Sequence, residues 1–303
     1  MSRSIGLAHI IRHDDGTSTG VWGLFTLKSA FQPIFAFRDG RLSIAAFEGL
    51  TRSFREKESV APPAFFRDVP AADRLHVETL TRTLHLLNAA RFLDDRSKIF
   101  VNFDPSVYSE RRLTEAAIRD MRLVLHETGI DPDRVVCEVT EQRSRSELQL
   151  STFVSVLRDR GFRIAVDDFG AESSDMERVT TLKPDIVKFD AHWISRLMET
   201  RPGVALLKVM VSQIADRGIE TVFEGIEQGR QLELAEQAGA DLVQGYALAR
   251  PRIVPANFTE FQARIPAGEM VDREHICSRE NDLSPARRRR VDHSRPFGRR
   301  ALS

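Results

Sequence analysis

Short apolar segments alternate with longer amphipathic segments along most of the chain. The apolar segments predict eight β-strands, at 31–37, 42–48, 98–102, 135–139, 163–167, 186–189, 221–224 and 242–244. Between them, apolar residues recur at helical spacing and predict helices around 62–87, 111–127, 146–160, 175–182, 204–217 and 228–238. Strands that alternate with helices form a mostly parallel sheet. Eight such strands predict an α/β fold closed into a TIM-like (β/α)8 barrel.

The first two predicted strands depart from this parallel arrangement. Only residues 38–41 separate them, and this segment contains Asp39-Gly40, a dipeptide typical of tight β-hairpins. A hairpin reverses the direction of the chain, so the first strand is expected to run antiparallel to the second. The predicted barrel therefore opens with an antiparallel strand.

Both ends of the chain lack this periodicity. Residues 1–24 are interpreted as a lead-in with a turn at 14–17, residues 25–265 as the barrel, and residues 266–303 as a disordered tail. From Pro285 onward the tail has seven arginines and one acid. A solvated terminus is the simpler interpretation, and docking on an anionic lipid, a nucleic acid or an acidic protein is the alternative. Few aromatic residues accompany the arginines, which disfavours sequence-specific RNA binding.

Composition narrows the class of protein further. Lys plus Arg and Asp plus Glu number 44 each, so net charge indicates neither nucleic acid nor a membrane as the main partner. Cys137 and Cys277 stand apart from any Cys/His cluster, which is typical of a reducing compartment and excludes a zinc site of the usual spacing. No signal peptide and no membrane span is apparent. We therefore expect a cytoplasmic protein.

Polar residues, most of them acids, close every predicted strand after the first. They are Glu48, Asn102, Glu138, the pair Asp167 and Asp168, Lys188, Glu224 with Glu227 just beyond it, and Gln244. The C-terminal ends of parallel barrel strands meet at one mouth, where barrel enzymes hold their active sites. Two like charges about 4 Å apart repel by roughly 4 kcal/mol at an effective dielectric constant of 20. Six acids at one mouth therefore indicate bound cations.

The ligand types at these strand ends indicate which cations. Carboxylate and amide oxygens without histidine favour Mg²⁺ or Mn²⁺, and there are enough for two ions, with Asp167 as a bridge. Two such ions commonly support phosphoryl chemistry. In this setting Lys188 is interpreted as orienting the attacking water or stabilising developing negative charge, and Arg52 as binding phosphate. The structural alternatives are a helix N-cap for the Asp167-Asp168 pair, an edge lysine and a surface arginine.

The order of these residues resembles the EAL-domain family, whose members are phosphodiesterases that linearise cyclic di-GMP. The matching motifs are Phe31-Gln32-Pro33-Ile34, Glu48-Gly49-Leu50 with Arg52, Val101-Asn102, Glu138-Val139-Thr140-Glu141, Asp167-Asp168-Phe169-Gly170, Val187-Lys188-Phe189-Asp190, Glu224-Gly225-Ile226-Glu227 and Gln244-Gly245-Tyr246. They extend from about residue 30 to residue 252. The resemblance implies a TIM-like barrel with an antiparallel first strand.

The resemblance also implies a role for each matching residue. One metal ion would be held by Glu48, Asn102, Glu138 and Asp167, and a second by Asp167, Asp168 and Glu224. Lys188 would position the water, Glu227 and Gln244 would support the water and metal shells, Arg52 would bind phosphate, and Gln32 would lie near a guanine. Glu141 would stabilise the loop after the Asp-Asp strand, a loop that the family also uses in forming homodimers.

Two departures from the family pattern keep a second function open. Gly49 replaces the alanine of the name-giving motif, and residues 171–175 read Ala-Glu-Ser-Ser-Asp where active members usually have Thr-Gly-Tyr-Ser-Ser. A catalytically weak or inactive receptor for cyclic di-GMP, or a module that binds a regulatory protein, is therefore the alternative to an enzyme. A Mg²⁺-dependent lyase agrees less well with the sequence, because such an enzyme gives Gln32 and Arg52 no evident function.

Overall fold

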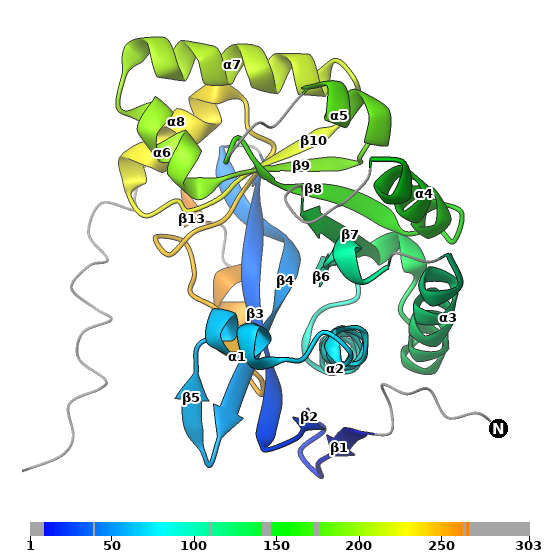
Figure 1. Cartoon of the computed structure of the whole chain (residues 1–303). Coiled ribbons are helices and arrows are strands. Elements are labelled where there is room, and N and C mark those ends of the chain that lie inside the picture. Colours follow the sequence, from blue (N-terminus) through cyan, green and yellow to red (C-terminus); the bar gives the residue numbers. More distant parts are fainter. Residues whose placement is uncertain are drawn as a thin grey trace, which may run out of the picture.

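The computed structural model describes residues 9–38, 40–108, 111–140, 147–171, 176–262 and 265–266. Eight strands close a barrel (Figure 1). They are β3 (Phe25–Arg38), β4 (Arg41–Arg55), β6 (Lys98–Phe103), β7 (Val135–Thr140), β8 (Arg163–Phe169), β9 (Ile186–Phe189), β10 (Glu220–Phe223) and β11 (Leu242–Val243). The strands from β4 to β11 pair in parallel, whereas β3 is antiparallel to both β4 and β11. The predicted TIM-like barrel with an antiparallel first strand is confirmed.

Helices follow the barrel strands and pack around the outside of the barrel (Figure 1). They are α1 (Pro62–Asp68), α2 (Arg74–Phe92), α3 (Arg111–Thr128), α4 (Glu147–Arg158), α5 (Met176–Leu182), α6 (Ala191–Met198), α7 (Arg201–Ala215) and α8 (Gly229–Ala238). The sequence did not predict α6. Its N-cap is Asp190, whose carboxylate accepts a hydrogen bond from the backbone N–H of Trp193 at 2.7 Å. None of the described helices combines the length and the apolar character that crossing a bilayer requires.

The β3–β4 hairpin is longer than the rest of the barrel. Strand β4 pairs with β6 only over residues 46–48 but continues along β3 to Arg55. The predicted strand end at Glu48 is therefore wrong, because this strand is stabilised beyond the barrel by its antiparallel partner rather than by parallel neighbours. Glu48 still lies at the level where the barrel mouth opens.

Further short strands extend this hairpin. They are β1 (Ile10–Arg12), β2 (Ser18–Trp22), β5 (Glu58–Val60), β12 (Arg252–Ile253) and β13 (Ile265–Pro266). Strand β1 pairs with β2 and β2 with β3, so part of the expected lead-in belongs to the sheet, and the predicted turn at 14–17 joins β1 to β2. Three-residue 3-10 turns lie at Pro105–Val107 and Pro132–Arg134, and a four-residue one at Thr259–Gln262. The tail after residue 266 lies outside the described residues.

Candidate active site

The interior of the barrel is built in layers along its axis. An apolar layer takes two residues from β3, Ile34 and Ala36, and one from each other barrel strand, namely Ala46, Phe100, Val136, Ala165, Ile186, Val222 and Leu242. Residues two apart on a strand point to the same face, so the position two residues further along each parallel strand belongs to the next layer, at the mouth. These positions are Glu48, Asn102, Glu138, Asp167, Lys188, Glu224 and Gln244, with Gln32 equivalent on the reversed strand β3. The polar layer at the mouth follows directly from strand periodicity.

Lys188 lies at the centre of the carboxylates in this polar layer. Its ammonium nitrogen is 2.5 Å from Glu138 Oε1, 2.6 Å from Glu224 Oε1 and 3.1 Å from Asp167 Oδ1. Glu48 Oε1 is somewhat further away, at 3.8 Å. The side chain of Lys188 is 1% exposed and that of Glu138 is 0% exposed, so these charges meet with almost no water. Four carboxylates around one ammonium group give the layer a net negative charge when all are ionised.

Burial and mutual repulsion shift the proton affinities of the layer. Burial raises the pKa of Glu138 well above its ordinary range, and the charges of Glu48 and Asp167 add to this shift while Lys188 opposes it. Burial likewise raises the pKa of Glu224 to about 8, against the attraction of Lys188. For Lys188, burial opposes the charged form, but the surrounding carboxylates outweigh it and raise the pKa well above its usual value. The cluster therefore attracts additional positive charge.

The unused oxygen atoms of the polar layer suit a divalent metal ion. Among the described residues, buried Glu138 Oε2 and buried Gln244 Oε1 have no hydrogen-bond partner, while Gln244 Nε2 donates to Glu48 Oε2 at 2.7 Å. Buried polar atoms without a partner are costly, and hard cations such as Mg²⁺ and Mn²⁺ prefer carboxylate and amide oxygens. The donor set and its charge therefore fit these cations.

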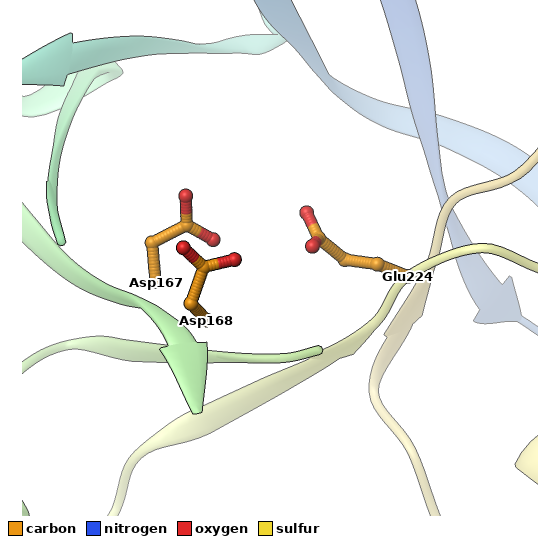
Figure 2. Close-up of side chains that lie close together, drawn as sticks. All are labelled: Asp167, Asp168 and Glu224. Carbon is orange, nitrogen blue, oxygen red and sulfur yellow. The ribbon is translucent and has the colours of Figure 1, made fainter. Parts of the chain in front are cut away.

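Asp167 and Asp168 both reach the mouth although they are consecutive on β8. Neighbouring strand residues normally point to opposite faces. Here Asp168 has a φ of +58°, and between 166 and 169 three steps along β8 match two along β9, which is a β-bulge. The bulge turns Asp168 beside Asp167, and both carboxylates face Glu224 (Figure 2). Asp167, Asp168 and Glu224 each offer an oxygen within 4.8 Å of the others, as a metal site requires.

The turn after Asp168 rests on Trp193 of α6. Gly170 has a φ of +98°, and a Cβ atom there would lie 2.4 Å from the ring of Trp193, so glycine is required. Phe169 packs edge-on against both Trp193 and Phe189. Trp193 therefore supports the backbone that turns Asp168 inward. The sequence indicated Gly170 through the family motif, but it gave no sign of the helix that contacts it.

The residues predicted to contact substrate lie along the β3–β4 hairpin. Gln32 is paired with Glu48 across the two strands and donates from Nε2 to Ala249 O at 3.1 Å. Arg52 is half-buried, lies on the same face as Glu48 four residues further on, and pairs with Lys28. The sequence analysis did not predict a role for Lys28. Extending the predicted hairpin pairing outward from Gln32 and Glu48 would have placed Lys28 opposite Arg52. Arg52 and Lys28 are thus neighbours across the two strands, and their backbone positions lie roughly 13 Å along the hairpin from that of Glu48, given about 3.3 Å per strand residue.

Three other predicted residues have different surroundings. Asn102 is exposed and pairs with Glu138 across β6 and β7, which leaves its amide accessible at the mouth. Glu227 is also exposed, and among the described residues the carboxylates paired with Lys188 are those of other acids. The backbone N–H of Glu227 donates to Gln231 Oε1 at 2.8 Å. Glu141 lies outside the described residues.

Helix α2 carries a buried polar stripe, defined here as Arg82, His85 and Asn88, that sequence analysis missed. Arg82 Nη1 contacts Asn102 O at 3.4 Å and Glu78 Oε2 at 3.1 Å. The other two residues reach β2, β3 and β4. The apolar residues of α2 predicted only core packing, yet its polar residues at spacing three touch the backs of the strands that carry the site. That spacing was the available signal.

Comparison with known families agrees with this geometry. The family model described as "EAL domain" matches residues 25–251, most of the chain. The chain belongs to the EAL-domain family. Its predicted resemblance to that family is confirmed.

Individual EAL proteins are similar to this chain over about three quarters of its length. The cyclic di-GMP phosphodiesterase RocR of Pseudomonas aeruginosa is 29% identical, over 73% of this chain and 56% of RocR. The BlrP1 structure from Klebsiella pneumoniae, a complex with manganese and cyclic di-GMP, is 27% identical with a TM-score of 0.67, over 75% of this chain and 56% of that one. The YkuI structure from Bacillus subtilis, with cyclic di-GMP and calcium, is 25% identical with a TM-score of 0.65, over 74% and 55%.

These EAL relatives place limits on what the likeness carries. The chain spans just over half the length of YkuI and RocR, so the activities of those whole proteins are not assigned to it by the likeness. The prediction of Mg²⁺ or Mn²⁺ as cofactor is confirmed by the acidic cluster and by the metal-bound EAL structures. The assignment of individual residues to individual ions stays a prediction.

Proposed function

We propose that this EAL domain hydrolyses cyclic di-GMP to the linear dinucleotide pGpG with the help of two Mg²⁺ or Mn²⁺ ions. The observation that carries the proposal is the buried ammonium of Lys188 amid the carboxylates of Glu48, Glu138, Asp167 and Glu224 at the barrel mouth. Degenerate EAL domains tend to lose these residues, and here Lys188 and every predicted metal ligand are retained. Family membership supports cyclic di-GMP as the substrate.

The residues divide between two metal positions in this proposal. Glu48, Asn102, Glu138 and Asp167 would hold one ion, and Asp167, Asp168 and Glu224 the other. The close approach of Asp167, Asp168 and Glu224 supports the second set. Bound ions of this kind supply positive charge that activates water and stabilises the negative charge developing on phosphate oxygens.

The protein's own residues would orient the reaction. Lys188 donates hydrogen bonds to the attacking water, whose oxygen forms a bond to phosphorus while the bond from phosphorus to the 3′ oxygen breaks. One proton of the water ends on that 3′ oxygen and the other passes to solvent. Glu227 and Gln244 support the water and the ligand shell, and Gln244 does so from a position where its amide already holds Glu48.

Substrate would lie along the β3–β4 hairpin, outward from Glu48. Arg52 engages a phosphate through its planar guanidinium group, and the neighbouring Lys28 adds charge on the same face. Gln32, fixed by its bond to Ala249, lies near a guanine. Phosphate binding away from the metal ions keeps the dinucleotide in register with the reacting bond.

A turnover assay tests the proposal. The purified protein is incubated with cyclic di-GMP and Mn²⁺ or Mg²⁺, products are separated by chromatography, and EDTA serves as the control. We expect pGpG to form only with metal. Binding of cyclic di-GMP without turnover at any metal concentration would reject the enzyme and favour the alternative, a receptor or protein-interaction module. The altered sequence at residues 171–175 and the additional C-terminal tail motivate that alternative.

Homodimerisation through the barrel and a regulatory protein partner belong to the same proposal. The family's use of the loop after the Asp-Asp strand motivates the dimer. Sedimentation velocity of the purified chain tests it, since a monomer at all concentrations would remove the dimer from the proposal while leaving the chemistry intact.

A further inference from the structure

Gly49 and His85 approach each other closely at the back of the site. A Cβ atom built on Gly49 would lie 3.0 Å from His85 Cγ and 3.2 Å from both Cβ and Cδ2 of the same side chain. Contacts this short force a neighbour to move by a few tenths of an ångström. Gly49 stands where the family motif has alanine. The departure at residue 49 is therefore matched by a side chain from α2 that occupies the space of the missing methyl group.

His85 cannot move easily because both of its ring nitrogens are engaged. Nδ1 lies 2.9 Å from Ser29 Oγ and Nε2 lies 3.3 Å from Thr51 Oγ1. Ser29 and Thr51 are partners across the β3–β4 hairpin, so one imidazole connects both strands. Either tautomer satisfies both contacts, since each hydroxyl can donate or accept.

A second residue of α2 fixes the position of this connection. Asn88 Nδ2 donates to Ser29 Oγ at 3.0 Å and to Ser18 O at 3.0 Å, while Asn88 Oδ1 accepts from Ser18 N at 2.8 Å. Asn88 is 0% exposed and His85 is 3% exposed. Buried hydrogen bonds of this kind hold their partners in one arrangement, because breaking any of them leaves a polar group without water.

The two faces of β4 carry residues with different roles: one face packs against helix α2, and the other carries residues of the proposed active site. Gly49 and Thr51 face α2, whereas Glu48 and Arg52, at the alternate positions, face the mouth. We infer that His85 is a positioning residue for Glu48 and Arg52, and that Gly49 is the complement that lets it approach. The inference rests on the proposed function, since it concerns the metal ligand and the phosphate-binding residue of that site.

The neutral state of His85 agrees with this structural role. Burial, together with the positive charges of Arg52 and Arg82, lowers the pKa of His85 to about 3. The imidazole therefore stays uncharged at neutral pH and adds no repulsion toward Arg52. Its contribution is geometric.

A double-mutant cycle tests the inference, with the variants Gly49→Ala, His85→Ala and the two combined. Free Mn²⁺ is followed by electron paramagnetic resonance without substrate, and KM for cyclic di-GMP is measured separately. We expect Gly49→Ala to weaken Mn²⁺ binding about 10-fold, equivalent to about 1.4 kcal/mol, and to raise KM. In the His85→Ala background the ring contacts are absent and only the 3.2 Å contact with the retained Cβ atom remains, so we expect the same methyl group to cause a clearly smaller change in both quantities.

The controls separate this inference from the proposed function. Gly229→Ala is the matched control, since a Cβ atom there meets nothing within 4 Å, and circular dichroism verifies that each variant is folded. Equal Mn²⁺ affinity in wild type and Gly49→Ala, or an equal loss in both backgrounds, would overturn the positioning role alone. Wild-type protein that binds neither Mn²⁺ nor cyclic di-GMP would reject the proposed function and the inference with it.

Discussion

Removal of metal should make the stability of this protein depend on pH through Glu224. The folded-state pKa of Glu224 is raised from 4.5 to about 8, first because of burial. The folded protein therefore holds a proton that the unfolded chain releases, so the stabilisation is complete below about pH 4.5 and is lost as the pH rises to about 8. At about 1.4 kcal/mol per pKa unit, the shift corresponds to a loss of about 5 kcal/mol across that range.

Added Mn²⁺ should oppose this loss. Metal binding requires the ionised carboxylate and occurs only in the folded state, so the affinity for Mn²⁺ rises over the same pH range. At about 100 times the dissociation constant, the ion stabilises by about 2.7 kcal/mol, or roughly 5 to 11 °C in the unfolding midpoint of a domain of this size.

Thermal unfolding between about pH 5.5 and pH 8.5, with EDTA or with Mn²⁺, measures both effects. The midpoint with EDTA should fall as pH rises, and the difference between the Mn²⁺ and EDTA curves should grow. Glu224→Gln should reduce the Mn²⁺-dependent difference and flatten its rise with pH, because it removes a ligand of one proposed ion and leaves the ligand set of the other intact. Glu78→Gln is the control, because burial also raises the pKa of Glu78, to about 7, yet it lies behind the site. Stabilisation by Mn²⁺ that is constant, or largest at low pH, would refute this reasoning.

Three further predictions concern single side chains. Lys188→Ala should lower kcat by at least about 100-fold, as expected for loss of a preorganised donor, whereas the exposed Lys208→Ala should not; near-normal rates would reject the assigned role. Arg52→Ala should raise KM for cyclic di-GMP more than it lowers kcat, unlike exposed Arg55→Ala, and equal KM values would remove Arg52 from phosphate binding. With the other tryptophan replaced by phenylalanine, Trp193 emission should be quenched by Mn²⁺ because the ring contacts the turn after the Asp-Asp pair; unchanged emission with Mn²⁺ demonstrably bound would contradict that arrangement.

Strand periodicity explains why much of the site could be predicted from sequence. Every parallel barrel strand has the same apolar-to-polar offset of two residues, as in Ala165 and Asp167 or Ile186 and Lys188, so one rule places all of them. The barrel itself follows from the same alternation. Local patterns are sufficient where a position depends only on its own strand.

Features that depend on contacts distant in sequence could not be predicted. Asp168 turns into the mouth through a bulge against β9 and a glycine that rests on Trp193. The continuation of β4 beyond Glu48 depends on β3 as its partner. In the sequence, His85 is one of several polar residues in an amphipathic helix. Its contacts with both strands of the hairpin become evident only when the helix is packed against them. In each case the deciding partner lies on another element.

The offset between the apolar layer and the polar layer also separates two kinds of inherited change. Substitutions in the layer of Ala46, Val136 and Ala165 alter closure of the barrel, and selection for any use of the fold acts on them. Substitutions two residues further along the strands, at Glu48, Glu138 or Asp167, leave the apolar layer unchanged. A lineage can thus give up turnover at one step while still inheriting an intact scaffold for recognising a nucleotide, which is how one fold comes to serve both enzymes and receptors.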